Sequence, residues 1–173
     1  MGRFSEAKID WSPFRICSPG EKAPYPRSLG TDEGLGDRLR FVAFAEKQAE
    51  NAFFLAAHVY PDLPEAVKNI WLALSREEAK HLGWLLDRMR ELGVDAAERP
   101  QSLALWQSFD RCASARDFAL FMANAEDRGR IAGEQFHETL MKSDPITGEL
   151  FRQIAEEEKT HIELAQSVMH HLG

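Results

Sequence analysis

Hydrophobic residues recur every three to four positions along four long segments of the chain, at about residues 35–59, 63–92, 115–141 and 145–172. This period places the apolar side chains on one face of a helix. No segment shows the sustained alternation of apolar and polar residues that is typical of a strand. The pattern therefore predicts an all-α fold with four long helices.

Turn and capping residues separate the four segments. Two pairs have the spacing of a capping box, one acidic residue precedes a proline at a first-turn position, and a glycine ends the second segment. These signals are carried by Asp62 with Glu65, Ser114 with Asp117, Asp144 with Pro145, and Gly93.

The lengths of the connections predict how the helices follow one another. The first and second segments are joined by "YPDLP", and the third and fourth by "KSDP". Short links of this kind join antiparallel neighbours. About 20 residues separate the second and third segments, enough for a crossover, and "SLALWQSFDRC" within them reads as a short helix. We therefore expect an antiparallel four-helix bundle made of two helical hairpins with a long crossover between them.

Residues 1–34 differ from the rest because they are rich in proline and glycine. Such a composition predicts an extended N-terminal arm without regular structure, in front of a helical domain at residues 35–173. Trp11, Phe14 and Tyr25 are suited to pin the arm to the bundle or to a neighbouring subunit. Two interpretations remain open: the arm covers apolar surface, or it acts as a functional lid.

Charge and composition restrict the class of protein. The 173 residues include 21 basic and 28 acidic residues, a net charge of −7, which argues against a broad nucleic-acid-binding face and leaves a local basic patch open. Cys17 and Cys112 form no CxxC pair, which suits a reducing compartment. The sequence contains neither a signal-like apolar run at its start nor a stretch of about 20 apolar residues. We expect a cytoplasmic protein that is not a membrane protein.

A glutamate interrupts each of the four apolar faces near its middle, and two faces add a histidine one turn later. Buried unpaired carboxylates cost several kcal/mol each, so four of them need compensation. Two divalent cations would balance four carboxylates, and one Glu from each of two helices plus Glu-x-x-His from each of the other two is a known dinuclear ligand set. The predicted ligands, which are also the candidate catalytic residues, are Glu46, Glu78, His81, Glu126, Glu158 and His161.

The ligand positions repeat along the chain. Each ligand of the first two segments recurs 80 residues later, as Glu46 does in Glu126. This indicates an internal repeat whose halves give three ligands each. A third Glu-x-x-His, Glu134 with His137, has no counterpart in the first half, and His137 lies roughly 16 Å along the helix from Glu126. We interpret this pair as separate from the site; the alternative is that Glu134 lines an access channel or reaches a second metal.

The ligand pattern resembles the ferritin-like superfamily of di-iron carboxylate proteins over about residues 35–172. Glu46, "EEAKH" at 77–81, Glu126 and "EEEKTH" at 156–161 carry the resemblance. It implies a ferritin-like bundle with two iron ions, although manganese or a mixed pair suits the same ligands. It also implies a non-haem oxidoreductase (oxygenase, peroxidase or ferroxidase) that activates O2 or peroxide, with an unknown small-molecule substrate or an external electron donor.

Departures from the family pattern narrow this expectation. Ala79 stands where a haem-binding bacterioferritin has methionine, so no haem is expected, and rubrerythrin's four-cysteine module is missing. An iron-binding or storage protein with ferroxidase activity is the alternative, and a purely structural metal site is a third. A homodimer is compatible with the sequence. Gly129 and Gly133, assigned to the same face as Glu126, favour either close helix packing or an open volume for substrate.

Overall fold

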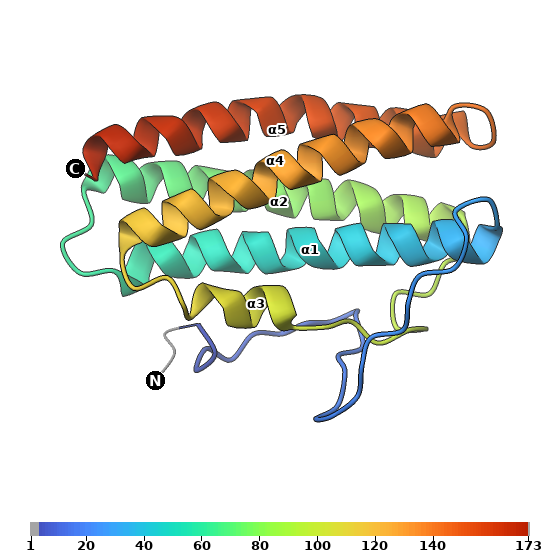
Figure 1. Cartoon of the computed structure of the whole chain (residues 1–173), viewed down its shortest axis with the longest axis horizontal. Helices are drawn as coiled ribbons and strands as arrows, with labels where there is room; N and C mark the ends of the chain where they lie inside the picture. The colour runs from blue at the N-terminus through green and yellow to red at the C-terminus, as the bar shows by residue number, and fades with distance from the viewer. Residues whose placement is uncertain (1–3, 173) are drawn as a thin grey trace. The chain divides into compact units, whose positions relative to one another are not determined.

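The regular structure of the chain is helical. The computed structural model describes residues 4–172, and no strand occurs among them apart from an isolated bridge between Ile16 and Gln101. The prediction of an all-α fold is therefore confirmed. The five helices are α1 (Asp32–Val59), α2 (Glu65–Glu91), α3 (Ala104–Phe109), α4 (Ala115–Leu140) and α5 (Pro145–His171) (Figure 1).

Most of the predicted helix ends are confirmed. Ser114 and Asp117 form a reciprocal capping box at the start of α4. Asp144 accepts a hydrogen bond from the Thr147 N–H, with a proline in the first turn of α5. Gly93 follows the end of α2 with a φ of 68°, the left-handed conformation that glycine adopts without steric cost. The short helix expected in the crossover is α3.

The predicted capping role of Asp62 is wrong. The helix α2 begins at Glu65, so Asp62 lies in the turn before it. The backbone of Asp62 has a φ of 59°. A residue that caps a helix start has extended backbone instead, so the left-handed turn replaces the capping box here.

The chain divides into two compact units. The first unit comprises the described residues of Met1–Ala52 and Ser75–Arg111, and the second those of Phe53–Leu74 and Cys112–Gly173. The helices α1 and α2 each contribute residues to both units.

In the second unit, α4 and α5 lie side by side and antiparallel (Figure 1). The turn between them is short, as the sequence predicts. An aromatic cluster fills another part of this unit: the ring of Phe118 meets Phe53 and Trp71 edge-on, at centroid distances of 5.9 and 5.1 Å. The Tyr60 hydroxyl donates to the Cys112 carbonyl, so its polar end is satisfied within the core.

In the first unit, the α1 and α2 segments run antiparallel. The Ser75 hydroxyl donates to the Glu50 carbonyl at 2.9 Å, whereas Glu46, one turn earlier on α1, faces His81, further along α2. Residue numbers therefore rise on one helix as they fall on the other. In this register Glu46 of α1 and His81 of α2 lie close together.

The N-terminal arm packs on the first unit through aromatic side chains. Trp11 and Phe14 both meet Phe44 of α1 edge-on, and Trp11 also meets Trp106 of α3. These contacts agree with the interpretation that the arm covers apolar surface. Tyr25 makes no such contribution, because 94% of it is exposed.

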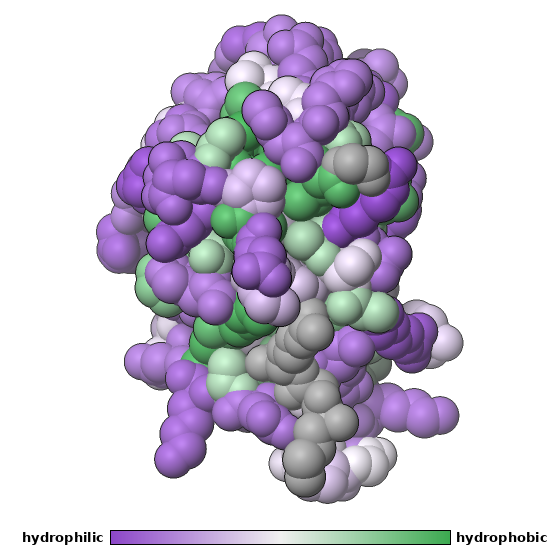
Figure 2. Space-filling view, turned by 90° about the vertical axis from the view of Figure 1, so that its left-hand side faces the viewer, coloured by the Kyte–Doolittle hydropathy of each residue, from purple (hydrophilic) through white to green (hydrophobic). Residues whose placement is uncertain are grey.

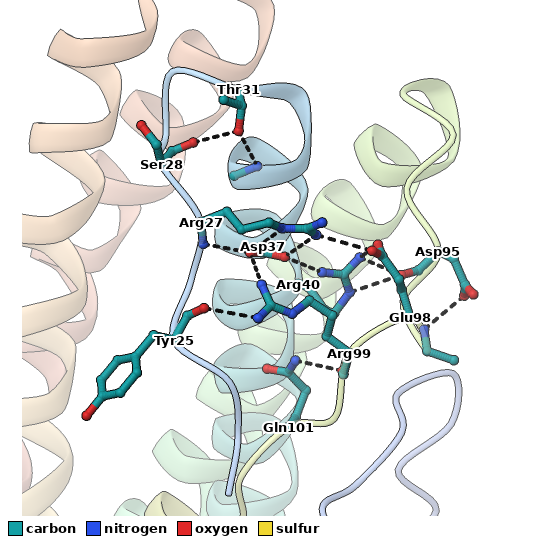
Figure 3. Close-up of polar contacts among 12 residues, drawn as sticks. Tyr25, Arg27, Ser28, Thr31, Asp37, Arg40, Asp95, Glu98, Arg99 and Gln101 are labelled. Carbon is teal, nitrogen blue, oxygen red and sulfur yellow. Dashed lines mark hydrogen bonds and ion pairs between the residues drawn. The ribbon is translucent and has the colours of Figure 1, made fainter.

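A buried aspartate joins the arm, α1 and the segment after α2 (Figure 3). The Asp37 carboxylate accepts hydrogen bonds from the backbone and guanidinium of Arg27, from Arg40 at 3.0 Å, and from Arg99. Burial alone would raise the pKa of Asp37, but the hydrogen bonds from Arg27 and the charge of Arg99 outweigh it and hold the pKa well below its ordinary range. Arg40, only 1% exposed, also donates to the Asp95 carbonyl and to Glu98.

Hydrophilic residues cover most of the face drawn in Figure 2, with hydrophobic residues between them. None of the five described helices combines the length and the apolar content that crossing a bilayer requires.

Replacing Asp37 with asparagine should destabilise the protein by about 3 kcal/mol, because the buried guanidinium of Arg40 loses a charged partner. Urea denaturation measures this change. The pKa of Asp37 is lower in the folded state than in the unfolded state, so its contribution is complete at neutral pH and is lost as the pH falls below about 4. The variant should lack this part of the acid dependence.

The matched control is Asp87→Asn, which breaks the exposed ion pair between Asp87 and Arg90 on α2. Exposed pairs contribute little, so this variant should remain close to wild type. Equal destabilisation by the two substitutions would contradict the assigned role of Asp37.

Candidate metal-binding sites

Three of the predicted ligands meet in the first unit. Glu46 comes from α1, and Glu78 and His81 come from α2; all three are buried, Glu46 being the most exposed at 8%. The His81 Nδ1 lies 3.9 Å from the Glu46 Oε2. One ligand atom from each of the three residues lies within 4.8 Å of the others. We call these residues the first set.

Helix geometry explains the placement of Glu78 and His81. Three residues separate them, so both project from one face of α2. Their face continues with Leu74 and Leu85, which are buried, so burial of the apolar stripe carries the two polar side chains inward. The neighbours Glu77 and Lys80 are partly exposed and pair with each other.

The second unit contains the corresponding residues, the second set. Glu126 comes from α4, and Glu158 and His161 from α5, and all three are buried. The His161 Nδ1 lies 3.6 Å from the Glu126 Oε2 and 3.4 Å from the Glu158 Oε2. Here too, one ligand atom from each residue lies within 4.8 Å of the others.

The second set concentrates negative charge at buried positions. Burial raises the pKa of the Glu126 carboxyl well above its ordinary value, and the nearby Glu158 carboxylate raises it further, while His161 opposes the shift. Two carboxylates this close require either a proton or a cation between them. Carboxylate oxygen with imidazole nitrogen is a ligand combination that divalent transition metals accept, so each set can hold a metal ion.

All six predicted ligands thus lie in one of the two sets, three in each unit. The third Glu-x-x-His has other partners. Both carboxylate oxygens of Glu134 accept from Arg130 at 2.9 Å, and the His137 Nδ1 lies 2.9 Å from the Gly148 carbonyl oxygen. These contacts support the interpretation that Glu134 and His137 are separate from the site.

The two glycines of α4 have different surroundings. A Cβ on Gly133 would approach the Ala155 Cβ to 3.2 Å and the Phe151 carbonyl oxygen to 3.3 Å, which indicates close packing of α4 on α5. Gly129 is exposed, and a Cβ there would meet no atom within 4 Å. Its assignment to the buried face is wrong, because it falls at the edge of the stripe, where solvent reaches it.

Buried polar residues that were not predicted from the sequence lie on another face of α1. Asp37, Arg40 and Gln48 are all buried, although none belongs to the apolar stripe that contains Glu46. Gln48 accepts a hydrogen bond from the Trp106 N–H at 2.9 Å. A detectable signal exists: together with Phe44 they recur every three to four residues, so α1 carries a second stripe of helical period.

The chain is similar to one family of proteins. Residues 12–172 match the family model described as "Protein of unknown function (DUF455)". No curated protein and no solved structure shows a significant match to the chain.

Substituting the two glycines by alanine should separate their roles. Gly129→Ala should stabilise the protein by up to about 1 kcal/mol, because alanine favours the helix and open space surrounds the new methyl group. Gly133→Ala should give less than this or destabilise, because the Phe151 backbone cannot move away easily. Thermal or urea denaturation compares them, and an equal gain from both would contradict close packing at Gly133.

Proposed function

The chain belongs to the DUF455 family, and we propose that it is a dinuclear non-haem iron oxidoreductase that activates O2 or peroxide. In this proposal the two sets act together as one centre in a ferritin-like four-helix bundle. The observation that carries the proposal is the same buried combination in each unit: one Glu from one helix, and Glu-x-x-His from the next.

Charge balance supports a pair of ions. Each set has two carboxylates and one imidazole, so one divalent cation neutralises it. The recurrence of the sets after 80 residues supports equivalent roles for them.

Iron, when bound, supplies the redox chemistry that O2 or peroxide activation requires; manganese or a mixed pair suits the same ligands. The residues of this chain have separate tasks. The four glutamates bind and neutralise the ions, and the two histidines complete the ligand sets. Burial of all six excludes bulk water. Cys17 and Cys112 are free thiols and form no disulfide. In this proposal the electrons for the reaction come from an external donor.

Anaerobic loading with Fe(II) should give about two ions per chain, measured by elemental analysis. Glu78→Ala and Glu158→Ala should each lose metal, because the remaining ligands leave the charge of the ions incompletely balanced. Controls are Glu77→Ala, the partly exposed neighbour of Glu78, and Glu134→Ala, whose carboxylate pairs with Arg130. Full metal content in the ligand variants, or equal loss in the controls, would rule out these ligand assignments.

A second measurement tests whether the two sets act as one centre. In a dinuclear centre the ions are magnetically coupled, and Glu78→Ala should lower occupancy of the second set as well as the first. Mössbauer spectroscopy and magnetic susceptibility detect coupling, and O2 uptake with a reductant should require both sets intact. Two uncoupled ions that are lost independently would refute a dinuclear centre while leaving two metal sites.

A further inference from the structure

A cavity of about 520 Å³ lies within the first unit. Its walls come from Ala23–Pro26 of the arm, from α1, and from residues 99–102, 104 and 105. Apolar side chains contribute most of the lining, among them Phe41, Phe44 and Leu105. Sites for small molecules have volumes of roughly 300–1,000 Å³ and apolar walls with a few polar groups, so this cavity has the size and character of such a site.

The cavity is separate from the first set of metal ligands. Phe41, Ala45 and Gln48 line it, and their spacing places them on one face of α1. Glu46 follows Phe41 by five residues, which turns its side chain about 140° around the helix axis from Phe41. The helix α1 therefore presents Glu46 on one face and the cavity on another. A molecule in the cavity would lie against a different surface from a metal in the first set.

The charged residues of the cavity wall are mostly positive. Arg38, Arg40 and Arg99 line it, with Asp37 as the one acidic residue in the lining. The chain as a whole carries a net charge of −7, so this excess of arginine is local. Three arginine side chains already surround the Asp37 carboxylate, which leaves it fully engaged (Figure 3). An anion would be attracted to this wall, and a cation would be repelled.

Arg99 is positioned to bind that anion. Its guanidinium is fixed by Asp37 on one side and by the Tyr25 carbonyl, at 3.0 Å, on the other (Figure 3). The Nε–H of Arg99 has no partner among the residues that the structure describes, and each terminal nitrogen has a second hydrogen. A fixed guanidinium with remaining donors recognises a carboxylate at little cost in side-chain entropy.

We propose that this cavity binds a small organic anion with an apolar body, of the class of medium-chain carboxylic acids. The carboxylate accepts hydrogen bonds from Arg99, and the hydrocarbon chain packs against Phe44 and Leu105. The buried amides beside the cavity are engaged by the protein: Gln48 with the Trp106 N–H, and Gln101 with the Arg99 carbonyl. These two amides therefore need no hydrogen bond from the ligand, whose part beyond the anionic head can be apolar.

Three probes with the same hydrocarbon body test the recognition of charge: decanoate, decanol and decylammonium. Isothermal titration calorimetry on the full-length protein should show one decanoate per chain. Decanol should bind about tenfold more weakly or worse, because it lacks the charge-assisted hydrogen bonds, and decylammonium should bind weakest. Equal affinity for decanoate and decanol, or no binding of decanoate, would overturn the proposal.

Two variants test the location. Ala104→Trp places a large ring at an exposed position in the cavity lining and should abolish binding of decanoate and decanol. Ala113→Trp is the control, an exposed alanine outside the lining, and should bind like wild type. Unchanged decanoate binding by Ala104→Trp would place the site elsewhere.

Arg99→Gln should weaken decanoate binding about tenfold or more while decanol binding stays unchanged. Arg99→Lys should recover part of the affinity through its charge. Unchanged decanol binding shows that the cavity is still formed, so equal weakening of both probes would mean that Arg99 only supports the wall. Iron content should be normal in every variant, so failure here leaves the proposed function untouched.

Discussion

A carboxylate taken out of water must be neutralised, and this chain meets that requirement in two different ways. Asp37 has three arginines of its own unit around it, so its pKa is held low and it stays charged. Burial raises the pKa of Glu126, the neighbouring Glu158 carboxylate raises it further, and His161 opposes the shift. The first arrangement is complete within the protein. The second is incomplete without a proton or a cation, which is the physical reason why that cluster can hold a metal ion whereas the Asp37 cluster has a structural role.

The helix α1 carries a buried carboxylate of each kind, Asp37 and Glu46, because it is buried on more than one face. One stripe contains Glu46 among apolar residues, and the other contains Asp37, Arg40 and Gln48. A helix with one apolar face would leave the opposite side to solvent. Here the arm and the residues after α2 cover that side, through the rings of Trp11 and Phe14 and through the ion pairs of Arg27 and Arg99. The cavity exists because this cover is anchored at its charged and aromatic contacts and does not fill the space between them.

Local rules made much of this structure predictable from the sequence. The helical period placed Glu78, His81, Glu158 and His161 on buried faces, and the capping residues of α4 and α5 marked their starts. Two of the errors, at Asp62 and Gly129, are also local: a left-handed turn replaced a cap, and a residue at the edge of a stripe was counted as inside it. The burial of Asp37, Arg40 and Gln48 could have been predicted from their helical period on α1, but the partner of Asp37 could not. Arg99 reaches Asp37 from a segment without periodicity, so no spacing in the sequence indicates that contact.

During synthesis the first unit is completed before the second, because all of its segments come earlier than the last segment of the second unit. Every residue of the first unit precedes Cys112, so Glu46, Glu78 and His81 have all left the ribosome's active centre before α4 is translated. The second unit takes residues 53–74 from the middle of the chain and completes itself only with the last helix. A nascent chain that ends near residue 111 therefore holds one whole ligand set together with a segment, 53–74, whose partners have not yet been made. A message truncated between the codons for Arg111 and Glu126 would yield the first set alone, and no C-terminal fragment beginning at residue 112 contains a whole unit.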